Sequence, residues 1–161
     1  EMKKLQDENE DLKSSRDQLF RKVDNNEQHS RNECLLLHGA AEAPGETSDQ
    51  AVAQFIKIAN DNLGITIAQE DVKRGHRLRK PKADGKPRPI IVRFAKHSVR
   101  QQVFSNKKKM KGLKMTFSEN LTDHRVTIMN EARNTYGPKM VWSIEGRLYA
   151  KTSKGNIQLK L

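Results

Sequence analysis

The side chains that most often perform catalysis or bind metals are few in this sequence and lie far apart. The single cysteine, Cys34, stands in an apolar run, where a thiol is more often a packing residue than a nucleophile. The histidines are His29, His38, His76, His97 and His124. They lack the CxxC, HxxxH or HExxH spacing of a metal site, and no GxSxG or GxxxxGK[ST] motif occurs. The sequence therefore predicts no enzyme, no metal and no cofactor.

The chemistry that the sequence does carry is positive charge, concentrated in one segment. The 161 residues include 31 Lys+Arg and 20 Asp+Glu, a net charge of +11. Residues 72–117 hold 16 basic side chains and one acidic side chain, whereas residues 34–71 hold one and six. Such a segment favours an anionic partner, because like charges oppose compaction unless phosphates or acidic groups lie opposite them. The side chains expected to contact nucleic acid are Lys73, Arg74, Arg77, Arg79, Arg88, Arg93, Arg100, Lys107, Lys108 and Lys109. The lysines at 107–111 have an alternative interpretation as a solvated helix end.

Residues 1–28 contain no Gly or Pro and repeat leucine every seven residues, which is typical of a coiled coil. The expected seam residues are Met2, Leu5, Asn9, Leu12, Arg16, Leu19 and Val23, with the leucines at d and the others at a. A helix with one narrow apolar stripe cannot bury it alone, so the pattern predicts self-association. A single solvated helix is the alternative. The mixed seam does not distinguish two strands from three.

From residue 34 to residue 117, short apolar runs alternate with helical patterns. Strands are expected at 34–38, 72–78, 90–94 and 115–117. Helices are expected from Ser48 or Asp49 to Gly64 and from Ser98 to about Lys109, with a mobile Pro-rich loop at 79–89. The resulting β-α-β-β-α-β order is that of the ferredoxin-like fold, shared by the RNA recognition motif. The predicted class is α+β.

An RNA recognition motif normally stacks bases on aromatic residues of its central strands. Here the strand at 90–94 offers Ile91 and Arg93 at its outward positions, and the strand at 34–38 offers Leu36. Binding is therefore expected to depend on phosphate contacts, with weak sequence preference.

The segment after residue 118 predicts a small third part. Asn120 can cap a helix from Leu121 to about Tyr136, with Val126, Met129 and Ala132 on its apolar face. Three short strands are expected at 140–144, 147–151 and 157–161. The predicted domains are a coiled coil at 1–30, a domain resembling the RNA recognition motif at 31–118 and a small C-terminal domain at 119–161. No run of 18 apolar residues occurs, so no membrane partner is expected.

Five strings, in this order, resemble landmarks of the first-open-reading-frame proteins of LINE-type non-LTR retrotransposons. They are SRN at 30–32, DVKRGHRL at 71–78, RPIIVRF at 88–94, ENLT at 119–122 with Arg125 and Arg133, and WSIEGRL at 142–148. The resemblance covers nearly the whole chain, including the order of the three predicted parts. A cellular or viral protein derived from such an element would resemble the family equally.

The resemblance implies a homotrimeric protein that binds single-stranded RNA, and also single-stranded DNA. Such a protein packages the element's transcript into a ribonucleoprotein, cytoplasmic and also possible in the nucleus, and acts as a nucleic acid chaperone during reverse transcription. By the same resemblance, Arg31, Arg125, Arg133 and Arg147 join the arginines at 74, 77, 88 and 93 as contacts. The coiled coil is shorter than is usual in the family, which leaves trimer against dimer open. The rival hypothesis is a coiled-coil adaptor whose basic domain binds an acidic protein.

Overall fold

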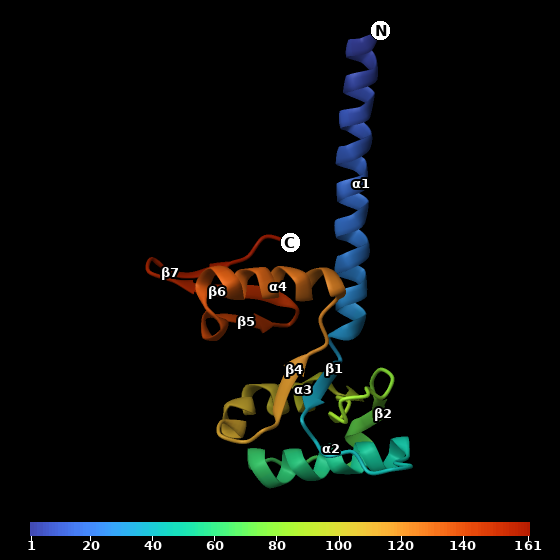
Figure 1. Cartoon of the computed structure of the whole chain (residues 1–161), viewed down its shortest axis with the longest axis vertical. Coiled ribbons are helices and arrows are strands. Elements are labelled where there is room, and N and C mark those ends of the chain that lie inside the picture. The colour runs from blue at the N-terminus through green and yellow to red at the C-terminus, as the bar shows by residue number, and fades with distance from the viewer. The chain divides into compact units, whose positions relative to one another are not determined.

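The computed structural model describes all 161 residues as an α+β protein with one long N-terminal helix and two antiparallel sheets (Figure 1). The chain divides into two compact units. Residues 32–120 form the central unit, and residues 1–31 together with 121–161 form the terminal unit. The two ends of the sequence therefore share one unit, in contrast to the sequence interpretation, which treats them as separate parts.

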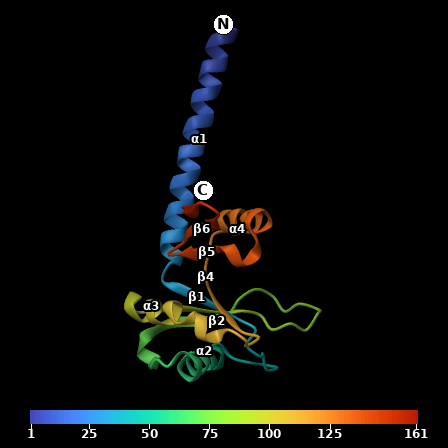
Figure 2. The ribbon, with the colours of Figure 1, turned by 90° about the vertical axis from the view of Figure 1, so that its left-hand side faces the viewer.

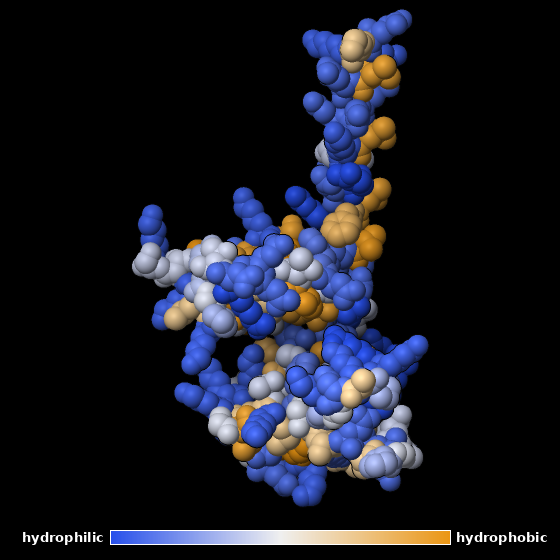
Figure 3. Space-filling model, viewed as in Figure 1, coloured by the Kyte–Doolittle hydropathy of each residue, from blue (hydrophilic) through white to orange (hydrophobic).

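Helix α1 (Met2–Arg31) is a continuous helix that leaves its apolar stripe open. The five apolar seam residues Met2, Leu5, Leu12, Leu19 and Val23 are 62% to 80% exposed. Figure 3 shows the stripe as orange side chains spaced along one side of the helix. None of the helices combines the length and the apolar character that crossing a membrane requires.

The central unit contains a four-stranded sheet and two helices. Its elements are β1 (Cys34–His38), α2 (Ser48–Leu63), β2 (Val72–Arg77), β3 (Ile90–Phe94), α3 (His97–Ser105) and β4 (Thr116–Glu119). The strands lie in the order β2-β3-β1-β4, and every neighbouring pair is antiparallel. The connection between β2 and β3, drawn in yellow-green, projects as an extended loop (Figure 2).

The core of the central unit lies between one face of this sheet and the two helices. Ile90, Val92 and Phe94 are buried in it, which confirms the predicted inward face of this strand. Phe55 of α2 contacts Phe94 and Phe117 edge to face, with ring centroids 6.0 and 5.3 Å apart. Large rings in this arrangement contribute both buried area and favourable geometry. The opposite face of the sheet carries the polar side chains described below.

Several boundaries differ from those expected, because nearby side chains cap the helices differently. Thr47, not Ser48 or Asp49, caps α2 and forms a capping box with Gln50. Helix α3 ends at Ser105, since Asn106 leaves helical geometry and its side chain donates to the carbonyl of Gln102, and residues 107–110 form a separate 3₁₀ turn. Strand β4 runs to Glu119, beyond the expected end at 117.

In the terminal unit, helix α4 (Asp123–Tyr136) covers one face of a sheet made of β5 (Val141–Ile144), β6 (Arg147–Thr152) and β7 (Gly155–Gln158) (Figure 1). Ala132, Val141 and Ala150 form its small core, with Met129 packed beside them. Val126, expected on the apolar face, is 41% exposed. Strand β7 begins and ends earlier than expected, and Leu159 turns inward to pack on this core.

Candidate nucleic-acid interface

The face of the central sheet that the helices leave uncovered gathers two of the predicted arginines. Arg93 lies on β3 beside the buried inward residues Val92 and Phe94, so its side chain is on the open face. Arg74 of β2 is its direct cross-strand partner, and His76 is opposite Ile91 on the same face. This open face, defined by Arg74, His76, Ile91 and Arg93, carries no Phe, Tyr or Trp.

The two arginines of the open face are unequally compensated. Arg93 lies 3.6 Å from the carboxylate of Glu33, and its side chain is 29% exposed. Arg74 is exposed and makes no ion pair. Like charges directly opposite each other on neighbouring strands destabilise a sheet. The pair therefore has a cost that an anion placed over the open face would relieve.

His38 lies at the end of β1 and adds a hydrogen bond rather than a charge. Its Nε2 is 2.8 Å from the hydroxyl of Ser118 on β4. Burial, together with the positive charge of Arg79, lowers the pKa of His38 below its usual value. The ring is therefore neutral at pH 7.

Two arginines expected to contact phosphate instead hold the base of the β2–β3 loop. Arg77 is 8% exposed, and its guanidinium donates to both oxygens of Glu46, at 2.7 and 3.1 Å. It also donates to the carbonyls of Ala40, Ala41 and Arg88. Arg88 is ion-paired with Glu42. Hydrogen bonds from Arg88 lower the pKa of Glu42, so this carboxylate is charged throughout the neutral range. Both arginines are occupied by the protein's own acceptors.

Arg100 and Arg125 are also buried rather than presented to a ligand. Arg100 of α3 is fully buried and ion-paired with Glu119, which is 4% exposed. Arg125 of α4 is 4% exposed and ion-paired with Asp24 at 2.9 Å. A buried guanidinium needs a carboxylate in reach, because an uncompensated charge is too costly to bury. These two residues stabilise the fold.

The lysine run lies with the helical layer and not on the open face. The 3₁₀ turn that contains it packs against α2, and Lys109 donates to the carbonyl of Leu63 at the end of that helix. The ammonium group of Lys107 lies 4.1 Å from the centre of the Phe104 ring. Lys108 is exposed. The helix-end interpretation thus accounts for Lys107 and Lys109.

The remaining predicted residues are scattered. Lys73 and Arg79 are exposed beside the open face and the loop. Arg31 binds Glu27 and the carbonyl of Leu121. Arg133 is half-buried and its Nε has no hydrogen-bond partner, whereas Arg147 is exposed on β6.

A buried polar cluster joins α1 to α4 in the terminal unit, and sequence reasoning missed it. Asp24 accepts from the hydroxyl of Thr122 at 2.5 Å and from Arg125. Gln28, 2% exposed, accepts from the backbone N–H of Thr122, and Arg125 donates to the carbonyl of Gly146. Thr122 is also the N-cap of α4, where Asn120 was expected. We call these five residues the Asp24–Arg125 cluster.

The electrostatics of this cluster favour the charged carboxylate. Burial alone raises the pKa of Asp24, but hydrogen bonds from Thr122 and Arg125, with the charge of Arg125, outweigh it and hold the pKa below its usual value. The cluster is therefore an intact ion pair at neutral pH.

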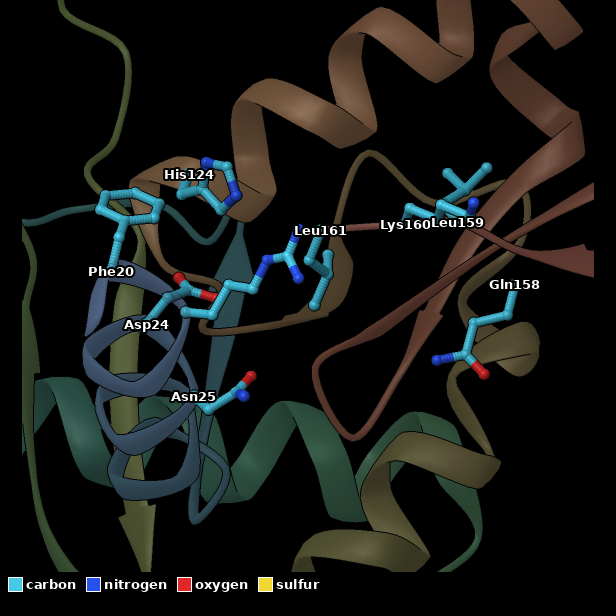
Figure 4. A pocket seen from close by; sticks show the side chains of 9 residues that line it. Phe20, Asp24, Asn25, His124, Gln158, Leu159, Lys160 and Leu161 are labelled. Atoms are coloured by element: carbon cyan, nitrogen blue, oxygen red, sulfur yellow. The ribbon is translucent and has the colours of Figure 1, made fainter. Parts of the chain in front are cut away.

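An open pocket of about 410 Å³ adjoins the cluster (Figure 4). It is lined by Phe20, Arg21, Asp24 and Asn25 of α1, His124 of α4 and residues 158–161 at the C-terminus. Phe20 and His124 meet edge to face, with ring centroids 5.0 Å apart. The structure contains no group of three or more His, Cys, Asp or Glu side chains that could hold a metal.

No protein-family model matches this sequence, and no curated protein matches it.

Proposed function

We propose that this protein is a self-associating, sequence-tolerant binder of single-stranded nucleic acid, acting in RNA packaging and as a nucleic acid chaperone. The LINE-type resemblance of its sequence supports this proposal. The observation that carries it is the cross-strand pair Arg74–Arg93 on the open face of the central sheet.

The geometry of this pair supports a phosphate ligand. The central unit has 17 basic and 9 acidic residues, and four of those acidic side chains already pair with Arg77, Arg88, Arg93 and Arg100. Arg74 and the loop residue Arg79 remain exposed. Phosphate oxygens accept charge-assisted hydrogen bonds from guanidinium groups without reading base edges. Weak sequence preference follows.

The topology supports the same proposal. The order β1-α2-β2-β3-α3-β4 with sheet order β2-β3-β1-β4 is compatible with a ferredoxin-like domain of the RNA recognition type. In that architecture, the face opposite the helices contacts RNA. Arg74 and Arg93 lie on this face. Residues 121–161 would then act as the small C-terminal domain.

Self-association through α1 completes the proposal. Its seam leaves five apolar side chains open at heptad spacing, and a second copy of the same helix offers the matching stripe. The Asp24–Arg125 cluster uses heptad positions b and f, on the opposite side of the helix, so the seam stays accessible. A trimer is favoured by the resemblance, and a dimer is the other outcome.

The test is a titration of 20-nucleotide single-stranded RNA and DNA of unrelated sequences at two salt concentrations. We expect similar affinities across sequences and a log–log salt slope of about −0.7 per phosphate contacted. The double variant Arg74→Gln/Arg93→Gln is expected to flatten the slope by about one phosphate or more. Lys57→Gln is the matched control, because Lys57 is an exposed cation on the helical layer.

A shallow slope in the unaltered protein would contradict the proposal. It would favour the rival function, a coiled-coil adaptor that binds an acidic protein. Equal effects of the Arg74/Arg93 and Lys57 variants would mean that binding occurs away from the open face.

A further inference from the structure

The outer face of the C-terminal sheet carries the only tryptophan of the chain beside a tyrosine. Trp142 of β5 and Tyr149 of β6 are directly opposite each other in register. Their rings are stacked, with centroids 6.0 Å apart and planes 17° apart. Both side chains are half-buried, so part of each ring remains open to solvent.

Strand alternation places this ring pair on the face away from α4. The neighbouring residues Val141 and Ala150 are buried and pack against Ala132 of that helix. Successive side chains of a strand point to opposite faces, so Trp142 and Tyr149 lie on the uncovered side. The hydrophobic core therefore does not account for these two rings.

The surroundings of the pair are cationic. Arg147 and Lys151 are exposed and lie two residues before and two residues after Tyr149, on the same face of β6. The segment 137–161 contains one acidic residue, Glu145, and five basic residues, Lys139, Arg147, Lys151, Lys154 and Lys160. An occupant of this face should combine a flat apolar group with negative charge.

We infer that Trp142 and Tyr149 form a stacking platform for unpaired bases of a single-stranded nucleic acid, whose phosphates are held by Arg147 and Lys151. Every base has a flat π face and every nucleotide carries a phosphate, so one strand satisfies both requirements without base-specific hydrogen bonds. The inference rests on the proposed function and extends it. The open face of the central sheet contacts phosphates, and the C-terminal sheet contacts bases.

The experiment compares two probes with the full chain at the same low salt. One is a 20-nucleotide oligo(dT), and the other is an abasic deoxyribose-phosphate strand of equal length. Because Trp142 is the only tryptophan, its fluorescence reports directly on the platform. We expect oligo(dT) to quench it at saturation and the abasic strand to bind more weakly and leave it nearly unchanged.

Variants separate stacking from charge. Trp142→Leu is expected to reduce affinity for oligo(dT) about tenfold and to leave affinity for the abasic strand unchanged. Trp142→Phe, which retains a ring, should preserve most of the affinity. Lys151→Gln should weaken both strands by the same factor, because it removes a phosphate contact only. Affinities are measured by anisotropy of end-labelled strands, and the fold of each variant is checked by circular dichroism.

The outcomes distinguish this inference from the proposed function. Equal binding of both strands by the unaltered protein, without quenching by oligo(dT), would overturn the platform and leave the phosphate-binding function intact. Equal losses on both strands for Trp142→Leu would also overturn it. If neither strand binds at low salt, the proposed function fails and the platform fails with it. Should Trp142→Leu not fold, the two-probe comparison with the unaltered protein and Trp142→Phe still decides.

Discussion

Replacing Asp24 by alanine should loosen the terminal unit, because it removes the only carboxylate paired with buried Arg125. The side chains of Asp24 and Arg125 are 6% and 5% exposed, so water cannot replace the lost partner. The hydroxyl of Thr122 loses its acceptor as well. Breaking one side of a buried ion pair costs about 3–5 kcal/mol. Small domains unfold with a total of about 5–15 kcal/mol, so this loss is a large share of the unit's stability.

The matched control is Asp17→Ala on the same helix. Asp17 pairs with Arg16 at 3.0 Å, but the two side chains are 59% and 72% exposed. A pair this exposed contributes about 0–1 kcal/mol. Both substitutions replace aspartate by alanine within α1, so their effects on helix propensity are alike. The difference between them isolates the contribution of burial.

The assay is urea unfolding followed by the fluorescence of Trp142. This tryptophan belongs to the terminal unit and the central unit has none, so the signal reports the terminal unit alone. We expect the unfolding midpoint to fall sharply for Asp24→Ala and to change little for Asp17→Ala. Equal midpoints for the two variants would refute the idea that the Asp24–Arg125 cluster holds α1 in place.

Three other predictions follow from the same contacts. Removing residues 1–21 deletes most of the exposed seam but keeps Asp24 and Gln28; light scattering should show a smaller particle, with the Trp142 unfolding transition retained. The pKa of Asp24 is lower in the folded state than its usual 3.8, so its stabilising contribution is present at neutral pH and is lost as pH falls below about 4; acid titration of Trp142 fluorescence should show this loss, and Asp24→Asn should reduce it. Arg100→Met leaves Glu119 buried without its partner and should destabilise the central unit by about 3–5 kcal/mol by circular dichroism, whereas Lys108→Met, at an exposed site, should change stability by less than about 0.5 kcal/mol.

The elements could be predicted from the sequence wherever the hydrophobic pattern was strong. The heptad leucines indicated α1, and the β-branched run at 90–94 indicated β3 with its correct inward face. Helix ends were less predictable, because Thr47 and Thr122 compete with neighbouring residues that are equally good caps. Strand β7 was misplaced because the apolar residues near the C-terminus pack at the edge of the small core rather than alternate within a strand.

The candidate site was harder to predict, because charge in a sequence does not reveal which charges pair. The excess at 72–117 suggested that its arginines needed external anions. In the structure, Glu42 and Glu46 pair with Arg88 and Arg77 from outside that segment. Arg100 likewise pairs with Glu119. These partners lie 19 to 46 residues away, and only the folded chain brings them together.

The Asp24–Arg125 cluster gave no signal in the heptad pattern. Asp24 and Gln28 occupy positions b and f, which face solvent in an isolated coiled coil. Polar residues there are ordinary, so nothing marked them as buried. A possible signal was the turn at Glu145-Gly146, where both residues have positive φ. A side chain at Gly146 would collide with Gln28, so the glycine permits the close approach of this turn to α1.

The terminal unit is discontinuous, since its hydrogen bonds from Asp24 and Gln28 to Thr122 and Arg125 span 94 to 101 residues. The central unit is an insertion whose entry and exit meet where Arg31 donates to the carbonyl of Leu121 at 2.9 Å. Such long-range closure makes a unit slow to fold. During synthesis the central unit can fold as soon as residue 120 has emerged, while the end of α1 waits for α4 and the β5–β6 turn. The open seam of α1 is available throughout that interval, so copies of the helix emerging from neighbouring ribosomes on one messenger RNA can associate before their terminal units close.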